Sequence, residues 1–411
     1  MPRLVTVEGR HVMRHALGSP LIRLLLLAWT AASSGLAQTP VPLETPAGQR
    51  FAERFDRAWE HPTGTPLHCD VLHSAARLEF GQDYWSEYFF AVRLAQIDPA
   101  AGHDGIVGVR VTPLEPASRR VYFFSPTTVP DVVPGVEVPG RAKASGGGVL
   151  NFGAGRYRID WLFQLKNLQG CRDSWTLRTG PAPELPGRLQ AGEAGALDGK
   201  QWAGFPAAPG REPRRATILI HATPRRGVRD RVHIAPQDIA ALMGCLRSLL
   251  ATGRYNSARI VVFQFYRTSV VLEINSLDPA GFRRVADALE AVDIGTIDVS
   301  TLQRANTRDD FLARLVLREE RGEPPSQDVY LLGFNRGFAN SWSVNWPAGS
   351  KLPFRLSYLA ITHQQETPQD AISQLVRKAG GHVVAIYNPR QWGKFLRSVA
   401  GTSPGLVDAK K

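Results

Sequence analysis

The hydrophobic positions of the chain follow two different periods, and the change between them divides the sequence. Between residues 67 and 180, short runs of alternating, aromatic and β-branched residues are separated by Gly, Pro, Asp and Asn clusters, with no helical pattern between them. Strands at this spacing predict an all-β antiparallel sandwich. The expected strands are residues 67–72, 75–80, 86–96, 106–113, 119–124, 148–152, 156–165 and 173–178.

The segments on either side of the predicted sandwich have different patterns. Phe51, Phe55 and Trp59 recur every four residues, which predicts a short amphipathic helix within an N-terminal segment, residues 38–66. Residues 181–213 are rich in Pro, Gly and Ala and poor in branched side chains. This composition predicts a linker.

From residue 214 the pattern changes to strands that alternate with helices. Residues 216–222 form a continuous apolar run, and Pro236 opens a helical pattern that extends to Leu250. The apolar runs at 258–265 and 270–274 are separated by only a few residues, which predicts that they pair as an antiparallel edge of the sheet. Buried strands covered by helices predict a doubly wound, Rossmann-like α/β domain over residues 214–400, followed by a tail at 401–411. The expected strands are residues 216–222, 258–265, 270–274, 329–334, 355–361 and 382–387.

Residues 1–37 have the pattern of a secretory signal peptide. Several arginines precede a short apolar run at 24–29, and Gly35 and Ala37 supply the small residues of a cleavage site after Ala37. The uncharged stretch 24–37 is shorter than the roughly 20 residues that span a bilayer. We therefore expect an exported protein, periplasmic or secreted, without a membrane span after signal cleavage.

The three cysteines fit an exported chain, because oxidising compartments permit disulfides. Cys69 and Cys171 both fall in the predicted sandwich, so their pairing is the simplest disulfide. Cys245 lies within a helical pattern and is expected to be a buried thiol. No cysteine lies near a cluster of His and Cys that could hold zinc.

Charge and motifs argue against several classes of function. The net charge of +12 is spread along the chain without blocks of like charge, and nucleic acid is not expected as a partner of an exported protein. The sequence contains no Gly-x-Ser-x-Gly, no His-Glu-x-x-His and no phosphate-binding loop. We expect no catalytic residues and no cofactor, and therefore a protein that is not an enzyme.

The order of elements from 216 to 398 resembles the von Willebrand factor A domain. That family has a strand, a helix, two strands at one edge, a helical region with a glycine-threonine turn, and then alternating strands and helices. Gly295-Thr296 falls where that turn belongs. Together with the preceding sandwich, the chain also resembles the exported two-domain proteins described as VWFA-related in acidobacterial genomes. The resemblance covers about half of the mature chain.

The resemblance includes a metal-site motif that this chain departs from. Metal-bearing members end the first strand with Asp-x-Ser-x-Ser and supply a second aspartate after the fourth strand. Here His221, Thr223 and Arg225 stand at the first cluster, and Asn335 follows the later strand. A guanidinium beside a cation in a partly desolvated site is repelled by several kcal/mol. We expect a degenerate site without metal, with His221 as a structural residue.

The resemblance also implies a binding surface at the carboxyl ends of the parallel strands. A long connection, residues 335–353, lies there and carries aromatic side chains, which suit binding hot spots but could instead pack the connection onto its own domain. The candidate binding rim comprises Thr223, Arg225, Thr296, Asn335, Phe338, Trp342 and Trp346.

The sequence therefore predicts a non-catalytic exported protein that binds another protein through this rim. We expect the partner to be another envelope or extracellular protein. A carbohydrate-binding or hydrolytic envelope protein is the alternative, although no pair of carboxylates is spaced for hydrolysis. The identity of the partner and the oligomeric state are left open.

Overall fold

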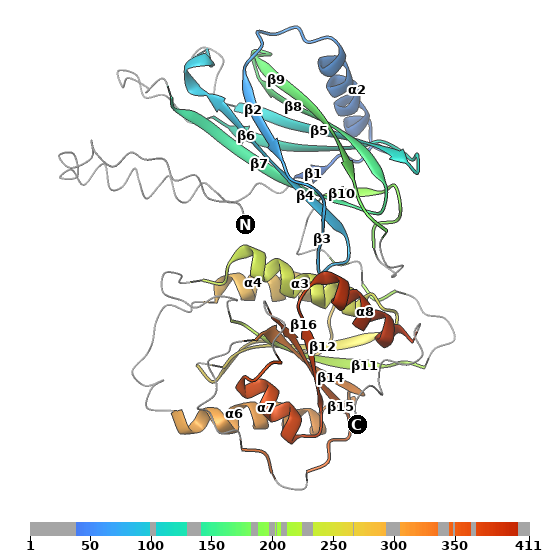
Figure 1. Cartoon of the computed structure of the whole chain (residues 1–411), viewed down its shortest axis with the longest axis vertical. Coiled ribbons are helices and arrows are strands. Elements are labelled where there is room, and N and C mark those ends of the chain that lie inside the picture. Colours follow the sequence, from blue (N-terminus) through green and yellow to red (C-terminus); the bar gives the residue numbers. More distant parts are fainter. Residues whose placement is uncertain are drawn as a thin grey trace, which may run out of the picture.

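A computed structural model of the chain describes residues 38–98, 104–129, 141–181, 188–196, 202, 204–206, 212–223, 233–265, 267–292, 305–335, 345–347, 350–362 and 367–401. The predicted signal peptide lies outside the described residues, as does the tail from 402 onward. The chain is mostly β-sheet, with helices gathered in its C-terminal half (Figure 1). In the part of the chain that the structure describes, no helix is both long and apolar enough to cross a membrane.

The N-terminal half is built from two antiparallel sheets. Within the described residues, one sheet has the strand order β1-β6-β5-β8-β9 and the other the order β10-β7-β4-β2, with β3 paired to β4. The strands are β1 (Thr39–Pro40), β2 (Cys69–His73), β3 (Arg77–Leu78), β4 (Tyr84–Arg93), β5 (Asp104–Glu115), β6 (Val121–Thr128), β7 (Lys143–Phe152), β8 (Arg156–Leu165), β9 (Gly170–Arg178) and β10 (Ala194–Ala196).

The two sheets share one apolar core because their alternating side chains face each other. Phe90 of β4 lies 5.1 Å from Trp161 of β8, measured between ring centroids, and Val109 and Ile159 are fully buried beside them. The sheets are also joined covalently. A disulfide links Cys69 of β2 to Cys171 of β9, with Cα atoms 6.1 Å apart, which confirms the predicted pairing. The buried Cys245 is the free cysteine.

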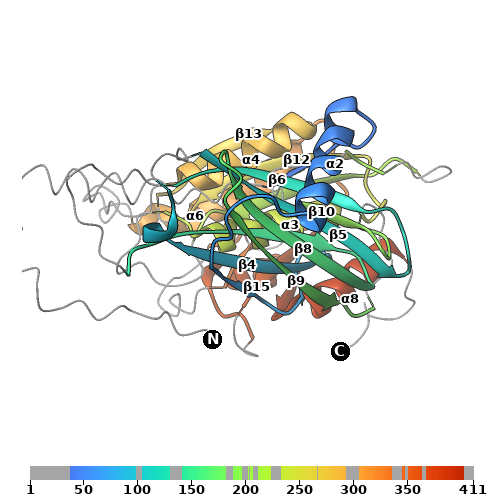
Figure 2. The same ribbon diagram turned by 90° about the horizontal axis from the view of Figure 1, so that it is seen from above.

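Helix α2 (Pro46–Glu60) packs on the outer face of the sheet that contains β5, β6 and β8 (Figures 1 and 2). The helix begins at Thr45, whose side chain accepts a hydrogen bond from the Gly48 amide at 3.1 Å. Its Phe55 is buried against Tyr122 of β6. Gly108 permits this approach, since a Cβ at that position would lie 2.8 Å from the Phe55 ring.

The segment predicted as a linker takes part in both halves. Its residues Ala194–Ala196 form β10, which pairs with β7, and the prediction is wrong at this point. Trp202 is buried in the core of the C-terminal half, where it stacks on Phe282 with ring centroids 5.8 Å apart. Composition did not show this, because a short strand and one tryptophan are fixed by tertiary contacts.

The C-terminal half contains a sheet with the order β13-β12-β11-β14-β15-β16, six strands in the described residues. All neighbouring pairs are parallel except the edge pair of β12 and β13. The strands are β11 (Arg215–His221), β12 (Ser257–Gln264), β13 (Ser269–Ile274), β14 (Asp328–Phe334), β15 (Arg355–Ile361) and β16 (His382–Ile386).

Helices cover both faces of this sheet (Figure 1). Proline stands at the start of three of them, as their sequence patterns predict. Thr307, whose residue type suits a helix cap, lies inside a helix instead. The face toward the N-terminal half carries α3 (Pro236–Leu250), α4 (Pro279–Ala291) and α8 (Pro389–Ala400), and the opposite face carries α6 (Ala305–Leu317) and α7 (Ala371–Lys378).

The two halves meet where the turn between β3 and β4 rests on α3 and α8. Phe80 of this turn belongs to the core of the C-terminal half. Its carbonyl accepts a hydrogen bond from the Ser248 hydroxyl at 3.0 Å, and Gln82 donates to the Pro389 carbonyl at 2.9 Å. Gly244 of α3 allows the close contact, because a Cβ there would lie 2.9 Å from the Gly81 nitrogen. The halves are therefore joined by direct packing.

Candidate functional site

The carboxyl edge of the parallel strands brings together polar residues from three strand ends. Thr223 lies two residues beyond β11, and Asn335 and Thr362 directly follow β14 and β15. The backbone amide of Asn335 donates to the Ile361 carbonyl at 2.9 Å, and the backbone amide of Thr362 donates to the Ile386 carbonyl at 3.0 Å. Two rim residues predicted from the sequence, Thr223 and Asn335, therefore lie on the same edge of the sheet.

Two side-chain oxygens at this edge are buried without an internal hydrogen bond. Thr223 has no exposed surface, and the Oγ1 atom of Thr223 and the Oδ1 atom of Asn335 have no hydrogen-bond partner among the described residues. A buried polar atom that stays unsatisfied costs about 1–3 kcal/mol. These oxygens are therefore groups that a further hydrogen-bond donor would stabilise.

His221, the last residue of β11, is held between neighbouring strands. It is 5% exposed, and its ring stacks on Phe263 with centroids 5.3 Å apart and planes at 16°. Phe265 contacts the same ring by its edge. Gly333 leaves room for this arrangement, since a Cβ at 333 would lie 2.9 Å from that of His221. Packing accounts for the placement of this histidine.

The other predicted rim residues cannot be placed. Arg225, Thr296, Phe338 and Trp342 lie outside the described residues. Within the described structure the rim therefore comprises Thr223, Asn335 and Thr362. Thr362 was not predicted from the sequence, although its position directly after a strand is the same signal that singled out Asn335.

The donor atoms of this rim do not fit a magnesium site. Thr223 offers a hydroxyl, Asn335 an amide oxygen and His221 an imidazole, whereas magnesium in proteins is held by carboxylates and water. Across the described ranges, no group of three or more His, Cys, Asp or Glu side chains is arranged to hold a metal ion. Any binding at this edge that uses these residues depends on hydrogen bonds.

We predict that divalent cations do not bind tightly at the rim. Millimolar Mg²⁺ or Mn²⁺ should leave the melting temperature unchanged, because a ligand raises it only by binding the folded state. Differential scanning calorimetry with and without the ion measures this. A rise of several degrees that Thr223→Ala abolishes would contradict the prediction.

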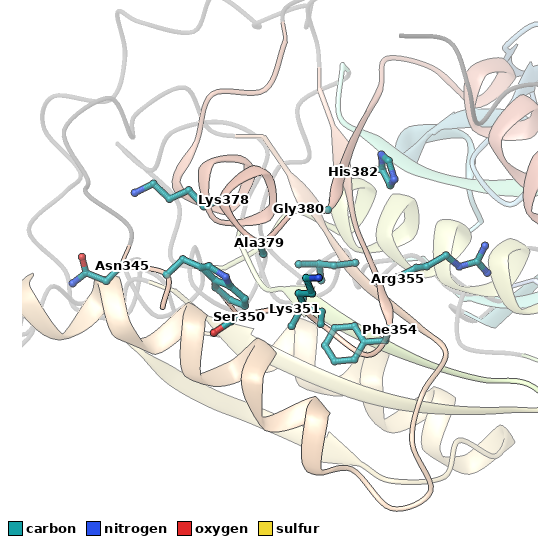
Figure 3. A pocket seen from close by; sticks show the side chains of 13 residues that line it. Asn345, Ser350, Lys351, Phe354, Arg355, Lys378, Ala379, Gly380 and His382 are labelled. Atoms are coloured by element: carbon teal, nitrogen blue, oxygen red, sulfur yellow. The ribbon is translucent and has the colours of Figure 1, made fainter. Parts of the chain in front are cut away.

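Trp346 does not share the edge with Thr223 and Asn335. It is half-buried and packs against the core under α6 and α7. It also lines a cleft of about 920 Å³ with residues at the amino-terminal starts of β15 and β16 (Figure 3). Trp346 belongs to the connection between β14 and β15, but it lies near the amino-terminal start of β15, away from the strand end at which this connection begins.

Basic side chains line the cleft around Trp346. Lys351, Arg355, Lys378 and His382 come from three different segments, and no acidic side chain is among the described lining residues (Figure 3). Arg355 is already paired with Asp328 at 2.7 Å. No pattern in the sequence marks this set, because its members are separated along the chain and meet only when β15 and β16 pair.

We predict that Trp346 supports its own domain. Trp346→Ala should lower the free energy of unfolding by about 2 kcal/mol, since a half-buried ring loses part of what a fully buried one would lose. Urea denaturation measures the change. Lys351→Ala, in the same cleft on an exposed side chain, serves as a control and should change stability little. An unchanged midpoint for Trp346→Ala would restore this tryptophan as a candidate binding anchor.

The free cysteine is not a candidate nucleophile. Cys245 has no exposed surface and lies in the apolar core between α3 and the sheet. Burial raises the pKa of its thiol well above the ordinary value, so that the reactive thiolate is disfavoured.

Comparisons with known proteins find distant structural neighbours. No family model matches the chain, and no curated protein sequence matches it. A von Willebrand factor type A structure from Catenulispora acidiphila aligns with 61% of this chain at 13% identity and a TM-score of 0.27. The N-terminal domain of TFIIH p34 aligns with 45% of this chain and 96% of its own length, at 12% identity and a TM-score of 0.18. The chain spans 46% of the length of the first of these neighbours, so the likeness is partial.

Proposed function

We propose that this chain is a non-catalytic, exported interaction protein that binds another protein at the carboxyl edge of its C-terminal sheet. In this proposal the N-terminal half is a β-sandwich, and the C-terminal half is a von Willebrand factor A-like domain that works without a metal ion. The order of its strands, with one antiparallel edge, supports this assignment. The edge is where open α/β sheets commonly bind ligands.

The observation that carries the proposal is the pair of buried oxygens on Thr223 and Asn335 that lack an internal hydrogen bond in the described structure. Each can accept a hydrogen bond, and they lie just beyond the ends of neighbouring strands, β11 and β14. Because Thr223 has no exposed surface, a partner reaches these oxygens only when the edge opens on binding, and its amide or hydroxyl group then satisfies them without a bridging cation. The neutral side chains replace the charge-based attachment of a metal site with hydrogen bonds, which are shorter in range and less sensitive to salt.

Two further features support export and an interaction role. A disulfide persists in oxidising compartments, and Cys69 and Cys171 form one here. The one thiol that remains free is buried and has a raised pKa, so it supplies no nucleophile. Both features agree with a secreted or periplasmic protein whose work is binding.

The test compares capture of a partner by wild-type protein and by Thr223→Val/Asn335→Leu. The mature chain is used as bait in an extract of the native cell envelope, captured proteins are identified by mass spectrometry, and the leading one is purified and its affinity remeasured. We expect the double variant to bind this protein at least tenfold more weakly. Its melting temperature should stay close to that of wild type, because the removed oxygens make no internal hydrogen bond in the described structure.

A control variant tests whether the loss of affinity is specific to substitutions at the edge. Lys351→Gln changes the cleft at the opposite end of β15 and should leave the affinity unchanged. If the double variant binds as tightly as wild type, the edge is not the binding surface. Binding of wild type to purified envelope polysaccharide, with no captured protein, would favour the carbohydrate-binding alternative instead.

A further inference from the structure

A groove runs beside α2 where this helix packs on the outer face of the N-terminal sheet. It has a volume of about 760 Å³, and its walls come from α2 on one side and from β5 and β8 on the other. Neither the predicted rim nor the cleft around Trp346 includes any of these residues.

The floor of the groove is apolar. Phe51 of α2 and Leu162 of β8 both line it, and Ile106 and Leu168 complete the surface. Ile106 is 48% exposed and Leu168 is 49% exposed, which places them among the most exposed large apolar side chains of the described structure. Their exposure leaves an apolar strip in contact with water unless a ligand covers it.

The upper wall of the groove carries a row of arginines. Arg50, Arg54 and Arg57 are spaced four and three residues apart, so they lie on one face of α2. All three are exposed, and none has an ion-pair partner among the described residues. Asp104, an acidic residue lining the groove, is engaged by Lys166 at 2.5 Å. The groove therefore combines an apolar floor with cations that form no ion pair within the described structure.

A second hollow extends the groove toward the disulfide. It has a volume of about 350 Å³ and shares Ala58, Thr63, Leu162, Gln164 and Leu168 with the first. Its far end is lined by Cys69 and Cys171. The groove follows α2 from Ala47 to Ala58, about 17 Å of helix, and so suits an extended chain better than a compact molecule.

The arginine-bearing wall is held rigidly in place. Asp56, on another side of α2, accepts a hydrogen bond from Arg110 at 2.6 Å and another from the Tyr122 hydroxyl at 2.9 Å. Arg110 also lies over the rings of Phe55 and Trp59. Because these contacts fix the helix on the sheet, the groove is preformed, and a ligand would not need to order it.

We propose that this groove binds a single-chain anionic lipid. The acyl chain would lie on the strip of Ile106, Leu162 and Leu168, and the anionic head group would pair with Arg54 and Arg57. Burying the chain removes the exposed apolar surface from water, and guanidinium groups bind phosphate and carboxylate by charge-assisted hydrogen bonds. An uncharged amphiphile satisfies only the floor, and a polyanion satisfies only the arginines.

The test measures binding of monomeric lipids to the mature chain by isothermal titration calorimetry. Lysophosphatidylglycerol is the anionic probe and lysophosphatidylcholine, with the same chain, is its zwitterionic control, each below its micelle concentration. We expect the anionic lipid to bind at least tenfold more tightly. Arg54→Gln/Arg57→Gln should abolish this preference, whereas Arg178→Gln, an exposed arginine of β9, should retain it.

A second variant tests the floor independently of the charge. Ile106→Asn should weaken the binding of both lipids by a similar factor. The melting temperatures of this variant and of the arginine variant are measured to confirm that both fold. Equal affinity of wild type for the two lipids would overturn the proposal. Binding to phosphatidylglycerol vesicles without binding of the monomer, or tighter binding of an acidic amphipathic peptide than of the lipid, would also overturn it.

Discussion

Replacing both Cys69 and Cys171 by alanine should lower the free energy of unfolding by about 4 kcal/mol. The disulfide joins residues separated by 102 positions, and closing a loop of that length removes much of the conformational entropy of the unfolded chain. The bond also connects an edge strand of one sheet to an edge strand of the other, β2 to β9. Its loss therefore loosens the contact between the sheets as well.

Thermal and urea denaturation with and without a reductant provide the measurement. Reductant should lower the melting temperature of wild type to that of the double variant, and should leave the double variant unchanged. If the double variant melts within about 2 °C of wild type, the bond contributes little to stability. If reductant instead changed the melting temperature of the double variant, the remaining cysteine, Cys245, would have to take part in a bond that the reductant breaks.

Asp160→Ala should lower the free energy of unfolding by about 4 kcal/mol, since it leaves the buried guanidinium of Arg110 without one of its two carboxylates. Asp160 is 1% exposed and pairs with Arg110 at 2.9 Å and with Arg158 at 2.9 Å. It also accepts a hydrogen bond from Ser174 at 2.9 Å. Arg110, whose side chain is 8% exposed, would then have only Asp56 as its anion.

Arg110→Leu is the matched comparison for this prediction. It leaves Asp160 with Arg158 and Ser174, and it replaces a charged side chain under α2 by an apolar one, so the loss should be smaller, about 2 kcal/mol. Urea denaturation of both variants shows which substitution lowers the free energy of unfolding more. A larger loss of stability for Arg110→Leu than for Asp160→Ala would mean that this cluster stabilises the protein mainly by attaching α2, and not by pairing the buried charge.

The sequence predicted best those elements whose signal is local. The helix that starts at Pro236 and ends at Leu250 lies where its apolar periodicity and its proline place it. The antiparallel edge of β12 and β13 followed from the short separation of two apolar runs. β7 was predicted too short, because its first part, Lys143 to Gly147, is poor in β-branched residues and is held as a strand by its ten-residue pairing with β4.

Tertiary contacts account for what the sequence could not predict. Residues 194–196 have a linker composition, yet they pair with β7. The positions of Thr223 and Asn335 on a common edge were predictable, because the carboxyl ends of parallel strands share an edge. Trp346 was not placed correctly, since nothing local shows at which end of the strands a residue of a long connection lies. The arginines of α2 were visible in the sequence, but the groove they line was not.

The turn at Phe80 has a consequence for the order in which the protein is completed. Asp83 in this turn pairs with Arg247, which follows 164 residues later in the chain. During synthesis or export, the two N-terminal sheets can form before α3 exists, and Phe80 then lies uncovered until the C-terminal half arrives. A chain that ends at residue 213 would keep this phenylalanine in water permanently. We expect such a fragment to self-associate, and to be rescued by adding the C-terminal half as a separate polypeptide.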